Sequence, residues 1–233
     1  MRYTVDTAVF AIDSNIKFGI LIGDNLKNSE TTKDDEDRLR AAEVKMRERI
    51  QADNVRELQS VSFYREFMTQ AGINPNKFPP SVEAMFKRIV KGGQLPVINA
   101  LVDLCNAVSI EQGISLGAHD LADIQAELEV RHSKSGDIFL PFGATEYEKV
   151  DEGELIFTSG NVVQTRKWIW RQSELGKTTI NSKNIFFQLV GFDDKEDSSL
   201  IKAMTDIEYL IENRFQGKCR RYVVDCNNTC IDF

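Results

Sequence analysis

Short apolar segments separated by a polar turn mark the start of the chain. Residues 7–12 are mostly apolar, and residues 16–22 are rich in Ile, Phe and Leu. Between them, Asp13-Ser14-Asn15 carries side chains that hydrogen-bond their own backbone and favour tight turns. This pattern predicts two strands, 7–12 and 16–22, joined as an N-terminal hairpin.

A helical period follows this hairpin. Between residues 34 and 59, apolar side chains recur at steps of three to five, and mixed charges fill the remaining positions. The spacing predicts one long amphipathic helix with a solvated charged face. Its apolar face consists of Leu39, Ala42, Met46, Ile50, Val55 and Leu58. Further helices are predicted over 62–70, from Ser81 to Gly92, and over 97–108, with Ser81 as a cap and Glu83 in the first turn.

After Gly113 the pattern changes to short apolar segments separated by Gly, Asp and Ser. These segments predict strands at 127–131, 137–142, 154–158, 162–170 and 185–192. A helix is expected over 198–215, followed by a last strand at 222–224. The predicted fold class is therefore α+β: one domain over 1–233, with N-terminal helices packed on a mostly antiparallel sheet that the hairpin joins.

Charge and composition narrow the possible functions. The net charge of −7 argues against a protein that coats nucleic acid nonspecifically, although a local basic patch is compatible with it. The longest apolar runs are far shorter than the roughly 20 residues of a membrane helix, which predicts a cytoplasmic protein without a membrane segment. The sequence contains no Walker loop, dinucleotide-binding glycine motif, nucleophile elbow or metalloprotease helix.

Three of the four cysteines, Cys219, Cys226 and Cys230, lie close together near the C-terminus. A zinc site is conceivable, but the paired two-residue spacing of such sites is missing. Both histidines, His119 and His132, are far away in the sequence. We therefore favour free thiols and expect no metal and no cofactor.

The most informative stretch runs from Tyr64 to Gly191. Several unlike short motifs occur there in order, and together they resemble the B3/B4 domain family, which includes the editing module of the phenylalanyl-tRNA synthetase beta chain and standalone bacterial proteins. The motifs are Gly72-Ile73-Asn74-Pro75, Leu95-Pro96-Val97-Ile98-Asn99, Val102-Asp103-Leu104-Cys105-Asn106, Gly117-Ala118-His119-Asp120-Leu121 and Trp168-Ile169-Trp170-Arg171-Gln172-Ser173. The chain is accordingly identified as a standalone member, with 61–192 as the family core between an N-terminal part, 1–60, and a C-terminal part, 193–233.

The resemblance implies a pocket in which the family clears tyrosine from the phenylalanine tRNA. The pocket asparagine corresponds to Asn106, near Asp103. The family's histidine corresponds to Gly117, its phenylalanine to His119, and its glutamate to Gln188. Because a Gln can hydrogen-bond a substrate but cannot act as a carboxylate base, the same editing chemistry is not implied. The resemblance does imply a pocket for a different small group.

Each of these residues also has a structural interpretation. Asp103 and Asn106 lie three apart on one helix face, where they either contact a ligand or hydrogen-bond nearby backbone. His119 is either a general base or a packed core residue. Trp168 and Trp170 alternate with cations on an expected strand, which places both indoles on one face, either in the core or available for base stacking.

Two hypotheses for function follow. The first is a protein that binds tRNA or aminoacyl-tRNA and hydrolyses a misacylated ester in trans. Its phosphate contacts would come from Arg131, Arg166, Arg171 and Lys177 on one basic face leading to the pocket. The second is a non-catalytic module that binds an amino acid or another small molecule in a pocket ringed by neutral or acidic groups.

Overall fold

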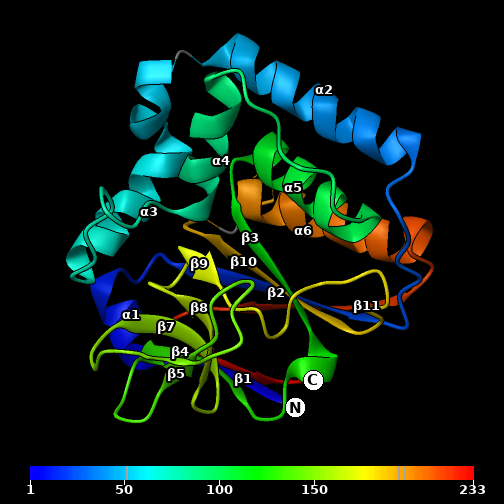
Figure 1. Ribbon diagram of the computed structural model, residues 1–233. Helices are drawn as coiled ribbons and strands as arrows, with labels where there is room; N and C mark the ends of the chain where they lie inside the picture. The colour runs from blue at the N-terminus through cyan, green and yellow to red at the C-terminus, as the bar shows by residue number, and fades with distance from the viewer. Residues whose placement is uncertain (51, 194, 197) are drawn as a thin grey trace.

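The computed structural model describes residues 1–50, 52–193, 195–196 and 198–233. These residues form two β-sheets, A and B, and a set of helices arranged in three layers (Figure 1). Most of the helices gather above sheet B, and sheet A lies beneath it, on the side where both ends of the chain are found. The α+β class is confirmed, but the single expected sheet is two sheets.

Sheet B is antiparallel and contains β10, a strand in which every residue is buried. Because side chains alternate along a strand, Phe187 and Leu189 pack against the helices, whereas Phe186 and Gln188 face sheet A. The pocket described below lies on this second face. In order, the strands are β11 (Lys218–Val224), β2 (Lys17–Asp24), β10 (Ile185–Gly191) and β3 (Ser115–Asp120).

Sheet A is mixed, with the order β12-β1-β4-β7-β8-β5-β6 and with β9 paired to β8. The pairs β1–β4 and β5–β8 are parallel, and the others are antiparallel. Tyr3 and Phe157 of this sheet pack against Phe18 and Phe186 of sheet B, which closes the core between the sheets. Its strands are β1 (Arg2–Val5), β4 (Leu128–His132), β5 (Ile138–Phe139), β6 (Glu148–Lys149), β7 (Leu155–Ser159), β8 (Val162–Arg166), β9 (Arg171–Gln172) and β12 (Cys230–Asp232).

Side-chain caps begin several of the helices. Thr32 and Asp35 form a capping box, Asn99 caps α5, and Ser198 caps α6. Gly113 ends α5 in the left-handed conformation, with φ of 65°. The helical elements are α1 (Thr7–Ile12), α2 (Lys33–Arg49), η1 (Ala52–Glu57), α3 (Gln59–Gln70), α4 (Ser81–Val90), α5 (Ala100–Gln112), η2 (Leu121–Asp123), α6 (Ser199–Tyr209) and the π-helical turn η3 (Leu210–Arg214).

The predicted N-terminal hairpin is wrong. Thr7–Ile12 is the helix α1, and Asp6 caps it by accepting a hydrogen bond from the Ala8 amide. A short, mostly apolar segment can be buried as a strand or as a short helix, and here the cap decides between them. The strand β1 precedes this helix and joins sheet A, whereas the confirmed second strand, β2, belongs to sheet B.

The predicted long helix is also shorter than expected. It ends at Arg49, residue 51 lies outside the described residues, and the 3₁₀ helix η1 covers 52–57. The helix expected from residue 97 begins only at Ala100, because Asn99 caps it there. As a result Ile98, which the predicted helix over 97–108 would include, lies before the helix and is 58% exposed.

The strand predicted over 162–170 stops at Arg166, because Lys167 and Trp168 take positive φ values of 49° and 66°. The period-two argument for the two indoles therefore does not hold. Trp168 is fully buried with its ring centroid 4.4 Å from that of Phe67, whereas Trp170 is half-buried. Within the described ranges, the helices are too short or too polar to cross a membrane.

Candidate ligand pocket and its basic rim

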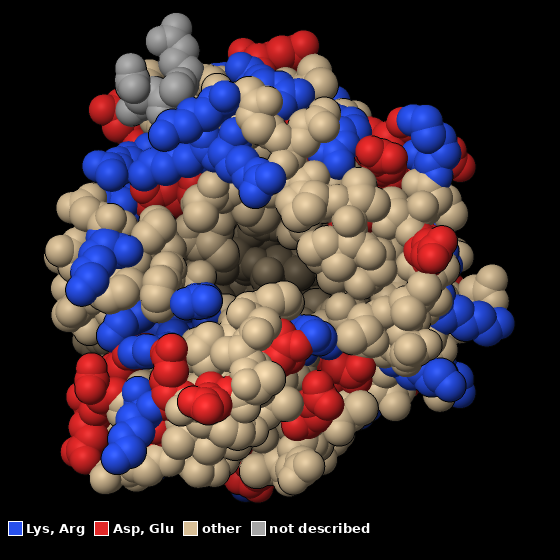
Figure 2. Space-filling view, in the orientation of Figure 1, with Lys and Arg blue, Asp and Glu red and all other residues tan. Residues whose placement is uncertain are grey.

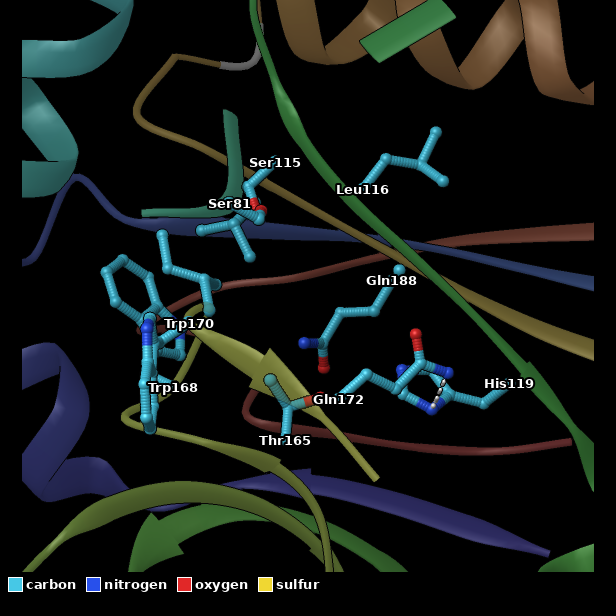
Figure 3. Close-up of a pocket in the computed structure, with 12 residues that line it drawn as sticks. Ser81, Ser115, Leu116, His119, Thr165, Trp168, Trp170, Gln172 and Gln188 are labelled. Atoms are coloured by element: carbon cyan, nitrogen blue, oxygen red, sulfur yellow. Dashed lines mark hydrogen bonds between the residues drawn. The ribbon is translucent and has the colours of Figure 1, made fainter. Parts of the chain in front are cut away.

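A pocket opens between the two sheets, next to the first residue of α4. It lies between β3 and β10 on one side and the segment from β8 to β9 on the other (Figure 3), and its cavity volume is about 80 Å³. Figure 2 shows a hollow at this place, walled by uncharged residues. The lining residues are Ser81, Ser115, Leu116, Gly117, His119, Thr165, Trp168, Ile169, Trp170, Gln172, Gln188 and Val190.

Three of the sequence candidates meet in this pocket. Gly117 lies directly opposite Gln188 in the β3–β10 pairing, and His119 lies two residues further along the same face of β3. Gln188 is only 5% exposed, and its Oε1 accepts a hydrogen bond of 2.9 Å from the Tyr3 hydroxyl. Burial raises the pKa of Tyr3 well above its usual value, so this hydroxyl keeps its proton.

His119 is enclosed at the end of the pocket away from the tryptophans (Figure 3). Its ring meets Phe157 edge to face, with centroids 5.0 Å apart. Burial lowers the pKa of His119 to about 3, so the imidazole is neutral at physiological pH. Its Nδ1 lies 3.4 Å from the amide nitrogen of Gln172. A Cβ at Gly117 would lie 3.0 Å from His119 Nε2, and the missing side chain therefore leaves room beside the imidazole.

Hydroxyl groups and an indole complete the lining. The sequence suggested that Ser81 caps α4, but Ser81 is instead the first helical residue. Its Oγ lies 3.3 Å from that of Ser115. The Trp168 Nε1 group is buried and has no hydrogen-bond partner among the described residues. A buried unpaired N–H is unusual in proteins and points to a missing partner.

Asp103 and Asn106 lie elsewhere. Both belong to α5, whose apolar side chains pack on the other face of sheet B. The Asp103 carboxylate accepts hydrogen bonds from the Ile98 amide and the Thr31 hydroxyl, which fixes the loop before α5. Burial raises its pKa. The structure thus separates these two residues from Gly117, His119 and Gln188.

The four RNA-contact candidates also have different surroundings. Arg131 is buried in a bidentate ion pair with Asp137, at 2.7 and 3.0 Å. Arg166 pairs with the buried carboxylate of Glu154 at 2.6 Å. Burial opposes ionisation of Glu154, but hydrogen bonds from Arg166 and Lys167 outweigh it and lower the pKa of this carboxyl.

The remaining two candidates are closer to solvent. Lys177 pairs with Glu174, and its ammonium lies 5.8 Å from the ring centroid of Phe142. Arg171 is exposed and lies in the chain between the pocket-lining residues Trp170 and Gln172. Among the described residues, no carboxylate pairs with Arg171 within ion-pair distance.

Sequence reasoning missed an aromatic and basic rim at the pocket. The Phe78 ring packs edge to face against Trp170, with centroids 4.8 Å apart. The ammonium groups of Lys77 and Lys167 each lie 5.1 Å from the Phe78 ring centroid. We call Lys77, Lys167 and Arg171 the rim cations, and Phe78 and Trp170 the rim aromatics. The Lys-Phe pair in the proline-rich loop 74–80 was the signal that could have revealed this rim.

A second group of cations lies over the helices. Arg56, Arg65 and Lys87 surround the fully buried carboxylate of Glu83, at distances of 3.5, 2.8 and 2.5 Å. Glu83 thus acts as an ion-pair partner in the first turn of α4. Figure 2 shows Lys and Arg side chains in a band above the hollow, over this part of the molecule.

The cysteines are free, and Cys105 is buried whereas Cys226 is exposed. Across the described part of the chain, no group of three or more His, Cys, Asp and Glu residues is placed to hold a metal ion.

Comparison with known proteins relates most of this chain to one family. The B3/4 domain family matches residues 63–225, further than the resemblance noted in the sequence. Phenylalanine--tRNA ligase beta subunits of Brucella abortus (strain 2308) and Brucella suis are each 35% identical over 82 residues, 35% of this chain. That stretch is only 10% of their own length.

Among solved structures, an N-terminal fragment of the phenylalanyl-tRNA synthetase beta subunit from Pyrococcus horikoshii is similar with a TM-score of 0.37 and 14% identity. The similarity covers 52% of this chain and 41% of that one. Because the family match spans most of the sequence and includes every residue that lines the pocket, the chain belongs to the B3/4 domain family.

Proposed function

We propose that this protein binds the acceptor end of an aminoacyl-tRNA, with the aminoacyl group in the pocket and the phosphates at the rim cations. The observation that carries this proposal is the position of the rim. Cations and half-buried aromatic rings stand directly beside a pocket that lies within the family region. Single-stranded RNA ends are recognised by this combination, because bases stack on aromatic rings while phosphates pair with Lys and Arg.

The overall charge makes the location of these cations important. A chain with a net charge of −7 repels a polyanion unless the positive groups are concentrated in one place. Lys77 and Arg171 are exposed, whereas Lys167 is half-buried and its ammonium is already paired with Glu154 at 2.6 Å. Arg131 and Arg166 do not add to this surface, since their guanidinium groups are held by Asp137 and Glu154.

The pocket residues support binding more directly than catalysis. His119 is a weak base because burial lowers its pKa to about 3, and Gln188 supplies an amide in place of a carboxylate. Hydrolysis of a misacylated ester in trans, the second part of the proposal, would therefore use a ribose hydroxyl of the tRNA and a positioned water.

Filter binding at several salt concentrations tests the interaction with tRNA. Lys77→Glu and Arg171→Glu should each weaken binding and reduce the slope of log K against log salt by about 1. Lys202→Glu is the matched control, because Lys202 is exposed on α6, on the other face of sheet B. Equal effects of all three substitutions, or no binding by the wild type at low salt, would contradict the proposal.

A deacylation assay tests the second part. The protein is mixed with a panel of mischarged tRNAs, and ester loss is compared with a no-protein sample and with Gln188→Ala. Protein-dependent hydrolysis of one aminoacyl-tRNA would establish trans-editing. Binding without hydrolysis would leave an aminoacyl-tRNA-binding protein.

A second candidate function is non-catalytic binding of a small molecule. It is favoured by one observation, namely that none of the described residues lining the pocket carries a charge. In that case a free amino acid or metabolite would bind equally well to the wild type and to the two rim variants. Under the tRNA proposal, the rim variants lose affinity for the charged tRNA only.

A further inference from the structure

The Gln188 side chain is held in one orientation. Its Oε1 is taken by the Tyr3 hydroxyl, which leaves the Nε2 group for the pocket. Figure 3 shows this nitrogen pointing across the cavity toward Trp168 and Trp170. Among the described residues, nothing accepts a hydrogen bond from it. Gln188 therefore presents a donor to any ligand in the pocket.

His119 also presents a donor. The Gln172 amide nitrogen donates to the carbonyl of Ala118 at 3.1 Å, which fixes the orientation of this amide, and it lies 3.4 Å from His119 Nδ1. Since an amide nitrogen can only donate, Nδ1 is the acceptor and the proton of the neutral ring is on Nε2. That Nε2–H group borders the space left free by Gly117, directly across from Gln188.

One more feature of the lining has the same sign. Trp168 carries a buried N–H without a partner in the described part of the chain. None of the described lining residues offers a carboxylate that would balance these groups.

From this arrangement we propose that the pocket binds a carboxylate group in preference to an ammonium group, because Gln188 and His119 present N–H donors to one cavity that Trp168 also lines. Hydrogen bonds from N–H groups to an ionised oxygen are stronger than those between neutral partners. An ammonium would find no acceptor in these N–H groups and would lose part of its hydration without compensation from them. The inference rests on the proposed function in assigning the same pocket, and it specifies an acidic side chain for the aminoacyl group.

Ligand-observed NMR with the full chain at pH 7 tests this directly. The probes are butyrate, butyramide and butylamine, which share a four-carbon skeleton and differ in donors, acceptors and charge. Butyrate should bind at least tenfold more tightly than butylamine, with butyramide between them. Butylamine binding as tightly as butyrate, or no binding of butyrate, would overturn the inference.

Gln188→Glu supplies the sharpest variant. It is nearly isosteric, Tyr3 can still donate to it, and it replaces the donor by an acceptor. This variant should lose at least tenfold in butyrate affinity and should gain affinity for butylamine. Gln59→Glu adds the same charge at an exposed position of α3 and should keep the wild-type preference. An unchanged preference in Gln188→Glu refutes the assignment.

Gly117→Ala is a second variant in case Gln188→Glu does not fold. Its methyl group enters the space beside His119 Nε2 and should weaken butyrate binding at least fivefold, whereas unchanged binding counts against the inference. Filter binding of glutamate-charged and glutamine-charged tRNA then identifies the source of the carboxylate. Butyrate binding without tRNA binding refutes only the tRNA proposal, and tRNA binding without a preference for carboxylates refutes only this inference.

Discussion

The hydrogen bond between Tyr3 and Gln188 joins the two sheets beneath the pocket. The substitution Tyr3→Phe removes this hydrogen bond and keeps the aromatic ring. The Tyr3 ring is fully buried and packs against Phe186 and Phe157 at centroid distances of 5.3 and 6.2 Å. Phenylalanine preserves these ring contacts. The substitution therefore deletes one hydroxyl and leaves Gln188 Oε1 buried without its partner.

The expected loss of stability comes from Gln188 Oε1, which stays buried without its hydrogen-bond donor. A lost buried hydrogen bond costs about 1 kcal/mol, and the unsatisfied carbonyl brings the total for Tyr3→Phe to about 2 kcal/mol. For a chain of this size, that lowers Tm by about 4–8 °C. Gln188→Met should cost a similar amount, because it orphans the Tyr3 hydroxyl instead. In the double variant both polar groups are gone, so the cost should fall short of the sum by about 1–2 kcal/mol.

Urea unfolding of the four proteins, followed by circular dichroism, measures this coupling. Tyr209→Phe is the matched control, because Tyr209 is 63% exposed and should change the free energy of unfolding by less than about 0.5 kcal/mol. If Tyr3→Phe behaves like this control, or if the two single effects simply add, then the hydrogen bond does not hold the pocket amide and the reasoning fails.

Three further perturbations test other parts of the structure. The pKa of His119 falls from 6.5 to about 3 on folding, so as the pH is lowered the unfolded chain takes up a proton before the folded chain does. The free energy of unfolding should therefore decrease below pH 6.5, by about 2 kcal/mol at pH 5. Urea titrations at pH 7 and pH 5 should show this loss in the wild type and in His132→Gln but not in His119→Gln. Arg131→Met should destabilise the protein by about 3–5 kcal/mol, because it leaves the Asp137 carboxylate buried and unpaired, and Asp137→Asn in the same chain should recover part of that loss. Gly19→Ala should cost about 1–3 kcal/mol in thermal melts, because its methyl group would lie 2.5 Å from a sulfur of α6, and an unchanged Tm would show that the helix moves away freely.

Sequence periodicity predicted much of the helical layer and several strands. Most predicted helices are present, because apolar spacing and caps such as Asn99 act within a few residues. The same local signals failed at Thr7–Ile12, where a short, mostly apolar segment fits either element. They also gave no warning of the turn at Lys167 and Trp168, where positive φ values are held by burial of the indole.

The candidate site was only partly predictable for a different reason. Gly117, His119 and Gln188 came from a family resemblance, and strand pairing brings them together. The partner that orients Gln188 is Tyr3, 185 residues earlier in the chain, and no local pattern connects the two. Charge alone was equally uninformative for Arg131, because burial decides whether a guanidinium meets solvent or, as here, the carboxylate of Asp137 six residues later.

The pairing of β1 with β12 and β4 has a consequence for biosynthesis. Residues 2–4 form their ladder with residues 230–232 on one side and lie parallel to β4 on the other. Contacts across so many residues form late, because a long loop must close first. A ribosome adds roughly 5–20 residues per second, so many seconds pass between the synthesis of Tyr3 and that of its partner strands β4 and β12. The hydrogen bond that orients Gln188 can therefore form only after residue 188 has left the ribosome, and shorter nascent chains should lack it.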